Sequence, residues 1–536
     1  MGISLFQAVT LAVAVELFLL GKALQKSDRS YPASWIASVF GINYGLLLFY
    51  NLAIYPVFVD PLRNVPGPRY GNVLALKVWY NHVVTKRKIG AQFYTEIART
   101  TPNEGIIAIR SFGSTMIVLT QPETITTVLV NERLSYTKPP QLRKFLRPIL
   151  GDGLVFLEGE EHRFGRKHTQ PAFNKAQIND LYPMMWGKAQ EMVAVIGKTL
   201  EPGYESGKVE IVRWATRVSL DIIGLAGLGH DFHSLTDVKD KLAGDYEELT
   251  ETTWGKLLWF LLMSRLSPTM TRFLLPGITK TMEDRVASVR NLSTKMIYEK
   301  MGAAKDGDDG QFDILSLLIS SNDFSEAQLT DHLLTLLVSG HETTSVAFVW
   351  MCYRLAIHQD AQKRLRTEVL NAIAGVEPSQ LPSILEGLPF LNAVMLEVLR
   401  LYPPLPMQSR VADVDTFILG HPLAKGTRVL IPAWIVNRAP ELWGPDADEF
   451  RPERWIDEDG RHNNMGGGSI GSMTFGRGPR GCIGEGFTKA ELRCMMCAML
   501  SHFEWTLNMP ISEVVPSGSV TIRPANGLHL KMKRLV

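Results

Sequence analysis

Apolar residues recur along most of the chain at the spacing of helices. Between residues 326 and about 365 they stand three and four positions apart, which predicts one long and largely buried helix. Shorter runs with the character of strands occupy residues 106–110, 115–119, 427–431 and 520–523. The pattern therefore predicts a mainly α protein with small β-sheets.

The first 60 residues are more apolar than the rest of the chain. Residues 5–20 are apolar with few exceptions, of which Glu16 is the one charge, and residues 31–59 contain no charge at all. A membrane-spanning helix needs about 20 predominantly apolar residues, so the second stretch is long enough and the first is marginal. We expect residues 1–60 to form a membrane anchor region with at least one transmembrane helix.

The topology of this anchor region stays open. If both stretches cross the membrane, Lys22, Lys26 and Arg29 lie on the non-cytoplasmic side, which opposes the positive-inside bias. One span with an interfacial segment avoids that conflict. A cleaved signal peptide is disfavoured, because no basic residue precedes the first apolar stretch.

A proline-rich segment, residues 60–68, follows the apolar region directly. Each proline fixes its own backbone and restricts the residue before it, so the segment should be a stiff linker. We expect the boundary between the anchor region, 1–60, and a catalytic domain, 61–536, at this point.

Composition excludes several classes of protein. With 4 Cys in 536 residues the chain is no disulfide scaffold. A formal net charge of +2 gives no broad positive surface for nucleic acid. We therefore expect no nucleic-acid partner.

One cysteine lies in an unusual loop. Cys482 stands in residues 475–484 among four Gly and two Arg, just before a helical pattern. Glycine lets a backbone approach a flat cofactor closely, and a thiolate needs nearby positive charge, which Arg480 can supply. The alternative is a glycine-rich surface turn around a buried cysteine. Cys352, Cys494 and Cys497 lie in apolar helical runs, so we assign them to core packing.

The long predicted helix carries a second group of polar residues, at positions 339–344. A glycine weakens a helix and an unpaired carboxylate is costly to bury, so Gly340, Glu342 and Thr343 suggest a functional site. The alternative is a bend in which Thr343 bonds back to the preceding turn. A zinc site of the type H-E-x-x-H is excluded, because Ser345 stands where the second histidine is required.

Further charged residues complete the set of candidates. Glu397 and Arg400 lie three apart in an apolar helical stretch and can pair. The other candidates are His162, Arg166, Arg410 and Arg454.

Together these motifs resemble the cytochrome P450 family from about Pro61 to the C-terminus. Residues 475–484 match F-x-x-G-x-R-x-C-x-G at every fixed position, and residues 339–343 match [AG]-G-x-[DE]-T except at Ser339. Residues 397–400 match E-x-x-R, with Arg454 as its third partner. Residues 162–166 are similar to W-R-x-x-R, with His162 in place of Trp.

The resemblance implies a role for each candidate. Cys482 is expected to be the axial ligand of the iron of haem b, in a loop that includes Phe475 and Gly476. Arg480, Arg410, His162 and Arg166 are expected to bind the haem propionates. On the distal side, Gly340 would open space for oxygen, Thr343 would hydrogen-bond the oxygen, and Glu342 would relay protons. Glu397, Arg400 and Arg454 would brace the cysteine loop.

The activity implied is the insertion of one atom of dioxygen into a lipophilic substrate. Electrons would come from NADPH through a separate cytochrome P450 reductase, because the chain has no flavin or nicotinamide fingerprint. The location implied is the endoplasmic reticulum membrane, with the catalytic domain cytosolic. By family position, the substrate pocket would involve residues 135–146, 336–340, 404–408 and 514–519.

The overall character is similar to that of fungal enzymes that tailor terpenoids, polyketides or alkaloids. Three alternatives remain: fatty acid or sterol hydroxylation, a haem-thiolate isomerase or dehydratase that needs no reductase, and a haem sensor. The retained Glu342 and Thr343 count against the isomerase.

Overall fold

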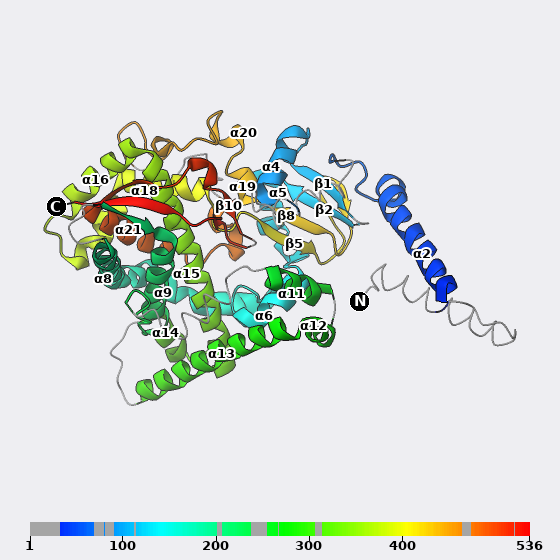
Figure 1. Ribbon diagram of the computed structural model, residues 1–536, viewed down its shortest axis with the longest axis horizontal. Coiled ribbons are helices and arrows are strands. Elements are labelled where there is room, and N and C mark those ends of the chain that lie inside the picture. The colour runs from blue at the N-terminus through cyan, green and yellow to red at the C-terminus, as the bar shows by residue number, and fades with distance from the viewer. Residues whose placement is uncertain are drawn as a thin grey trace.

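The structure, a computed structural model, is mainly helical. It describes residues 33–68, 90–111, 114–200, 206–236, 254–265, 267–305, 313–461, 473–518 and 520–535, together with the single positions 15, 80 and 463. In Figure 1 the helices form the larger part of the body, and the largest sheet lies at the end from which α2 projects. The predicted fold class, helical with small sheets, is confirmed.

The α-helices are α2 (Ala33–Phe49), α4 (Gly90–Thr100), α5 (Pro122–Thr126), α6 (Pro140–Leu150), α7 (Gly159–Thr169), α8 (Lys175–Thr199), α9 (Ile211–Leu228), α11 (Trp254–Arg265), α12 (Pro268–Leu274), α13 (Pro276–Lys305), α14 (Ile314–Ser320), α15 (Glu326–Ile357), α16 (Gln359–Ile373), α17 (Leu381–Gly387), α18 (Pro389–Leu401), α19 (Ala433–Val436), α20 (Pro440–Trp443) and α21 (Glu485–His502). Short 3-10 helices are η4 (Arg133–Ser135), η5 (Gln170–Phe173), η6 (Pro378–Gln380), η7 (Pro452–Trp455), η8 (Met473–Phe475), η9 (Gly478–Arg480) and η10 (Ile511–Glu513), and π-helical turns are η1 (Tyr50–Val59) and η3 (Thr127–Asn131).

The strands are β1 (Ile106–Ser111), β2 (Ser114–Leu119), β3 (Tyr136–Thr137), β4 (Ser206–Glu210), β5 (Gln408–Ala412), β6 (Thr416–Ile418), β7 (His421–Leu423), β8 (Arg428–Ile431), β9 (Phe503–Leu507), β10 (Pro516–Ser517), β11 (Arg523–Pro524) and β12 (His529–Arg534). The largest sheet has the order β1-β2-β8-β5-β3, in which only the β2–β8 pair is parallel. The order β4-β12-β9 makes a second sheet, and two hairpins complete the set. Of the predicted strand runs, 520–523 is mostly wrong, since only its last residue lies in a strand.

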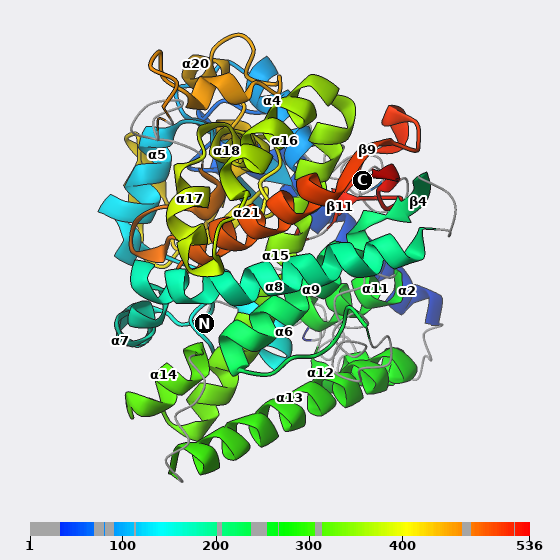
Figure 2. The same cartoon turned by 90° about the vertical axis from the view of Figure 1, so that its left-hand side faces the viewer.

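Helix α15 forms the centre of the helical part. It begins with a capping box, in which the Ser325 side chain accepts from the Gln328 backbone and the Gln328 side chain accepts from the Ser325 backbone. The helix ends at Ile357 rather than near 365, because His358 leaves the helical region and α16 starts after it. Helix α9 packs on α15, and α8 packs on both α9 and α21 (Figure 2). Their apolar faces make one continuous core.

The second apolar stretch of the sequence folds into α2 and the π-helical turn η1. No helix of the described residues combines the length and the apolar character that a membrane span requires. The first apolar stretch, 5–20, lies outside the described residues except at position 15. The transmembrane assignment of the anchor region therefore stays a prediction.

The start of the proline-rich segment belongs to the folded body. Asp60 is buried; its carboxylate accepts from the Leu62 N–H at 2.9 Å and from the Thr115 hydroxyl at 2.6 Å, and it pairs with Arg110 at 3.2 Å. Leu62 and Val65 are buried in the same core cluster as strands β1 and β2. This segment therefore fastens the chain to the edge of the largest sheet.

Candidate functional site

The loop that carries Cys482 runs from η8 through η9 to the first turn of α21. The Cys482 N–H donates to the Phe475 carbonyl at 2.8 Å, and the Gly481 N–H donates to the Gly478 carbonyl at 2.9 Å. Gly476 and Gly478 have φ of +71° and +65°, the left-handed region that favours glycine. At Gly478 a Cβ would also lie 3.0 Å from the Leu129 carbonyl oxygen. These glycines let the loop fold back and place the cysteine at its end.

The environment of Cys482 differs from that of the other three cysteines. Its side chain is accessible, whereas Cys352, Cys494 and Cys497 are buried, as predicted for core residues. Protein groups nevertheless surround the Cys482 sulfur closely, so burial raises the pKa of the thiol, while the Gly484 N–H and the charge of Arg166 oppose the rise. Burial also raises the pKa of the other three thiols. Cys482 is therefore the one of the four cysteines whose side chain is accessible, and it has both an N–H donor and a cation nearby to support a thiolate.

Arg166 connects this loop to α7. Its Nη1 donates to the Gly481 carbonyl at 2.7 Å. Arg163, on the same helix, has a side chain that is 81% exposed and pairs with Glu160. The predicted residue of the W-R-x-x-R-like motif thus lies next to Cys482.

A group of positive side chains lies between α7, β5 and the cysteine loop. Burial and the charges of Arg480, Lys138, Arg166 and Arg410 lower the pKa of His162 to about 4. Arg410 is buried, and its Nη1 donates to the neighbouring Ser409 carbonyl at 3.0 Å. Sequence reasoning placed His162, Arg166, Arg410 and Arg480 in one site, and the structure brings the four together.

Lys138 and Glu158 belong to the same group, and sequence reasoning missed both. Arg480 pairs with the Glu158 carboxylate and donates to the Leu157 carbonyl at 2.6 Å. Lys138 Nζ lies 3.7 Å from Glu158. Burial and the neighbouring Arg480 and Arg410 lower the pKa of Lys138 to about 7, although Glu158 opposes the shift. Lys138 falls within residues 135–146, a region assigned to the substrate pocket by family position, but no pattern assigned it to the propionate group, and Glu158 lies outside every matched motif.

The charges of this group do not balance. Three arginines, Arg166, Arg410 and Arg480, and the partly charged Lys138 surround the neutral His162, and Glu158 is the one carboxylate that the described ion pairs place among them. Buried cations are costly unless they are paired, so the group is suited to further anionic ligands. The two propionates of a haem would supply such charges, with Cys482 nearby as the axial ligand. The residues present therefore fit the cofactor that the sequence motifs imply.

The polar residues of α15 each have a partner in the structure. Thr343 donates its hydroxyl to the Ser339 carbonyl at 2.7 Å, which is the back-bonding considered as the alternative. The bond leaves the acceptor capacity of this hydroxyl in place. Gly340 faces α9, where a Cβ would lie 2.6 Å from Ile223 Cγ1, so the close approach of the two helices gives this glycine a packing role.

Glu342 contacts a residue that sequence reasoning did not name as a partner. The Thr521 hydroxyl donates to Glu342 Oε1 at 2.5 Å. No ion pair of the described residues involves Glu342, so its carboxylate meets a hydroxyl rather than a cation. Thr521 lies just beyond residues 514–519, one of the predicted pocket regions, and no local pattern signalled the contact.

Glu397, Arg400 and Arg454 form the predicted buried cluster. Arg400 donates from Nε and Nη2 to the two oxygens of Glu397, each at 2.8 Å, and Arg454 Nε donates to Glu397 Oε1 at 2.9 Å. Burial tends to raise the pKa of Glu397, but the bonds and charges of Arg400 and Arg454 outweigh it and lower the pKa. Trp455 adds an indole N–H to the same carboxylate at 2.9 Å.

Asn437 links this cluster to the cysteine loop. Its side-chain amide donates to the Arg400 carbonyl at 3.0 Å, and its side-chain oxygen accepts from the Met473 N–H at 2.8 Å. The Thr474 hydroxyl also donates to the Leu399 carbonyl at 2.7 Å. The start of the loop is thus hydrogen-bonded to the end of α18, as a bracing role requires.

One buried carboxyl takes no part in these groups. Glu491 lies on α21, and neither carboxyl oxygen has a hydrogen-bond partner of normal geometry among the described residues. Burial raises the pKa of Glu491 to about 8, although the nearby hydroxyls of Ser219 and Thr344 lower it. At neutral pH this side chain is therefore mainly protonated.

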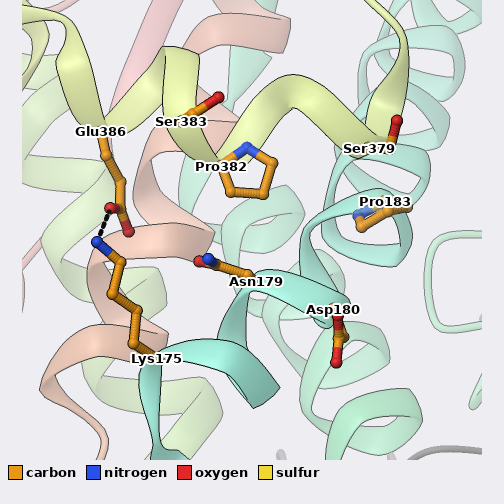
Figure 3. A pocket seen from close by; sticks show the side chains of 8 residues that line it. All are labelled: Lys175, Asn179, Asp180, Pro183, Ser379, Pro382, Ser383 and Glu386. Atoms are coloured by element: carbon orange, nitrogen blue, oxygen red, sulfur yellow. Dashed lines mark ion pairs between the residues drawn. The ribbon is translucent and has the colours of Figure 1, made fainter.

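A pocket of about 410 Å³ lies apart from these residues (Figure 3). Residues of α8 and of the segment that includes η6 and α17 line it, and Lys175 and Glu386 form a 3.0 Å ion pair across it. None of the predicted site residues lines this pocket. It therefore contributes nothing to the assignment of the site.

Comparison with known proteins agrees with this geometry. A family model described as Cytochrome P450 matches residues 65–530. The cytochrome P450 monooxygenase sphH of Aspergillus fumigatus is 36% identical over 98% of this chain and 97% of its own length. Cytochrome P450 monooxygenase ptmK of Penicillium ochrochloron is 36% identical over 91% of this chain and 96% of its own length. Cytochrome P450 monooxygenase abl5 of Leptosphaeria maculans is 31% identical, with coverage of 99% and 98%.

Proposed function

The chain belongs to the cytochrome P450 family and is a cytochrome P450 monooxygenase, and on that premise we propose that it hydroxylates or otherwise oxygenates a lipophilic metabolite in a fungal biosynthetic pathway. The observation that carries the proposal is the juxtaposition of Cys482, Arg166 and the positive group around His162. Family membership implies a haem-thiolate cofactor, which when bound supplies the oxidising chemistry.

In the proposed holoenzyme, the proximal residues bind and orient the cofactor. Cys482 would supply the thiolate that holds the iron, and Arg166 holds the loop through the Gly481 carbonyl. Arg410, Arg480 and His162 would hold the propionates, and Lys138 would join them because it lies in the same group of side chains. Burial and the neighbouring cations lower the pKa of the His162 ring to about 4, and the uncharged ring can still donate one N–H.

On the distal side, we assign proton handling to α15. Thr343 keeps its hydroxyl at a defined position through the Ser339 carbonyl and can still accept a hydrogen bond. Glu342, the residue before Thr343, has a carboxylate that can take up and release a proton. These roles rest on the match to the family motif and on the geometry of these two side chains.

The substrate class rests on the relatives and on the amino-terminal region. The relatives named above are monooxygenases of filamentous fungi. Residues 31–59 contain no charged residue, as expected for a chain held at a membrane where lipophilic compounds concentrate. We therefore propose a tailoring step on a terpenoid, polyketide or alkaloid, with fatty acid or sterol hydroxylation as the second candidate.

The electron supply and the location follow the same reasoning. We propose that NADPH reduces a separate flavoprotein reductase, which passes electrons to this chain. We also propose that the anchor region holds the protein in the endoplasmic reticulum membrane, with the catalytic domain in the cytosol.

Two measurements test this function. The purified full-length chain, reduced under carbon monoxide, should give a thiolate-type spectrum. Reconstituted with NADPH-cytochrome P450 reductase in phospholipid vesicles, it should consume NADPH when a lipophilic compound that shifts its spectrum is added. Product formed without NADPH would establish an isomerase or dehydratase instead. A six-coordinate iron with no turnover would indicate a sensor.

A further inference from the structure

The contact between Glu342 and Thr521 joins two segments that lie far apart in the sequence. Thr521 is buried, and its hydroxyl donates to Glu342 Oε1 at 2.5 Å. The other carboxylate oxygen, Oε2, accepts no hydrogen bond within the part of the chain that the structure describes. A carboxylate held in this way has one oxygen fixed and one oxygen able to exchange protons.

The backbone around Thr521 is itself held against α15. The Ile522 N–H donates to the Pro404 carbonyl at 3.0 Å, and the Ile522 carbonyl accepts from the Trp350 indole N–H at 2.9 Å. Trp350 lies two turns beyond Glu342 on the same helix and is fully buried. The hydroxyl that meets Glu342 is therefore fixed relative to the helix that carries Glu342.

The turn before Thr521 is equally constrained. Gly518 has φ of +140°, and a Cβ at this position would lie 1.8 Å from the Thr521 carbonyl oxygen. Only glycine fits such a close approach of backbone to backbone. The backbone of Gly518 therefore lies directly against the Thr521 carbonyl.

The chemistry of the pair favours positioning over simple packing. The side chain of a glutamate samples many rotamers unless something holds it. Glu342 is only partly buried and has no cationic partner among the residues that the structure describes, so the Thr521 hydroxyl is the group that restricts it.

We propose that Thr521 is a positioning residue, whose hydroxyl holds the carboxylate of Glu342 in the orientation that proton transfer requires. The inference rests on the proposed function, in which Glu342 handles protons for oxygen activation. Thr521 acts through Glu342 and needs no contact with substrate or cofactor.

The test compares Thr521→Val, which removes the hydroxyl and keeps the shape, with Thr521→Ser, which keeps the hydroxyl. Each haem-loaded full-length variant is reconstituted with the reductase and NADPH, using a lipophilic compound selected by its spectral shift. We expect Thr521→Val to lower product per NADPH about tenfold and to raise hydrogen peroxide, because a displaced catalytic group loses rate on this scale. Thr521→Ser should restore the parental ratio. Ser512→Ala, at an exposed position nearby, serves as the control.

A second readout does not depend on turnover. In a double-mutant cycle of urea unfolding, Thr521→Val and Glu342→Gln should be non-additive, because the two residues share one bond. If Thr521→Val forms as much product per NADPH as the parent, the positioning role of Thr521 is wrong, although the monooxygenase function stands. If Glu342→Gln forms as much product per NADPH as the parent, Glu342 does not handle protons, and Thr521 then has no positioning role either. If the parent consumes no NADPH with any selected compound, the proposed function itself is wrong.

Discussion

Arg166 donates a 2.7 Å hydrogen bond to the carbonyl of Gly481, the residue before Cys482, although 315 positions separate the two along the chain. The bond brings α7 to the cysteine loop and places a guanidinium beside the thiol. That cation lowers the pKa of Cys482, although burial has the larger and opposite effect. Arg166 therefore has both a structural and an electrostatic connection to the proposed ligand.

Replacing Arg166 with Ala should weaken the cysteine loop and its hold on haem. A hydrogen bond from a charged donor contributes about 1.5–3 kcal/mol, and Arg166 is partly exposed, so we expect a loss near the lower value. The haem-to-protein ratio after purification and urea unfolding measure the effect. Arg163→Ala, on the exposed side of α7, should change neither quantity. Equal losses in the two variants would mean that general weakening of α7 is the cause.

Cys482→Ala should abolish the thiolate-type spectrum of the reduced carbon monoxide complex. Cys482 has an accessible side chain with the Gly484 N–H and Arg166 nearby, whereas Cys494 and Cys497 are buried in α21. Cys494→Ala and Cys497→Ala should keep the spectrum. Retention of the thiolate-type spectrum in Cys482→Ala would show that another group binds the iron.

Thr343→Ala should separate oxygen activation from cofactor binding. Its hydroxyl bonds back to the Ser339 carbonyl within one helix, so its loss should barely affect folding or the spectrum. With reductase and a selected compound, NADPH consumption should continue, peroxide should rise, and product per NADPH should fall. Thr343→Ser should recover coupling. A loss of activity without peroxide is incompatible with the assigned role.

Removing Glu397 should destabilise the protein strongly. Glu397→Ala leaves the buried guanidinium of Arg400 without its carboxylate, and breaking a buried pair costs about 3–5 kcal/mol. The free energy of unfolding in urea measures this loss. Glu453→Ala breaks the exposed pair with Arg364 and should have little effect. A small change at Glu397 would contradict its bracing role.

Glu491→Gln should change how stability depends on pH. The folded-state pKa of Glu491 is about 8 and the ordinary value is 4.5, so between these values the folded protein holds a proton that the unfolded chain has released. Stability from this group is present below pH 4.5 and is lost as the pH rises towards 8, by up to about 1.4 kcal/mol per pH unit. Glutamine cannot ionise. The free energy of unfolding of the variant, measured in urea, should therefore rise relative to that of the parent from pH 5 to 8. A constant difference would show that Glu491 ionises alike in both states.

Local patterns predicted much of the site, because several groups lie within one short segment. Residues 475–484 carry their glycines and Cys482 in a fixed order, and Glu397 and Arg400 share one helix face through their spacing alone. The structure places Arg454 on the same carboxylate, which family resemblance had implied.

Contacts between distant segments could not be predicted in this way. Lys138 and Glu158 join the positive group only because η4, β3 and α7 fold against the cysteine loop. Thr521 meets Glu342 from a segment that the pattern assigned to a strand. The predicted end of the long helix, near residue 365, lies beyond the observed end of α15 at Ile357, because the apolar spacing continues across His358 into α16.

The close approach of α9 to Gly340 has a consequence for altering substrate range by directed evolution. Any side chain at 340 projects towards Ile223, whose Cγ1 and Cδ1 would lie 2.6 and 2.7 Å from the new Cβ. Substitutions at position 340 alone would therefore mainly push α9 and α15 apart rather than change the shape of a pocket. Libraries should vary 340 and 223 together, pairing a larger residue at one with a smaller residue at the other. Natural relatives that depart from glycine here should show the same compensation.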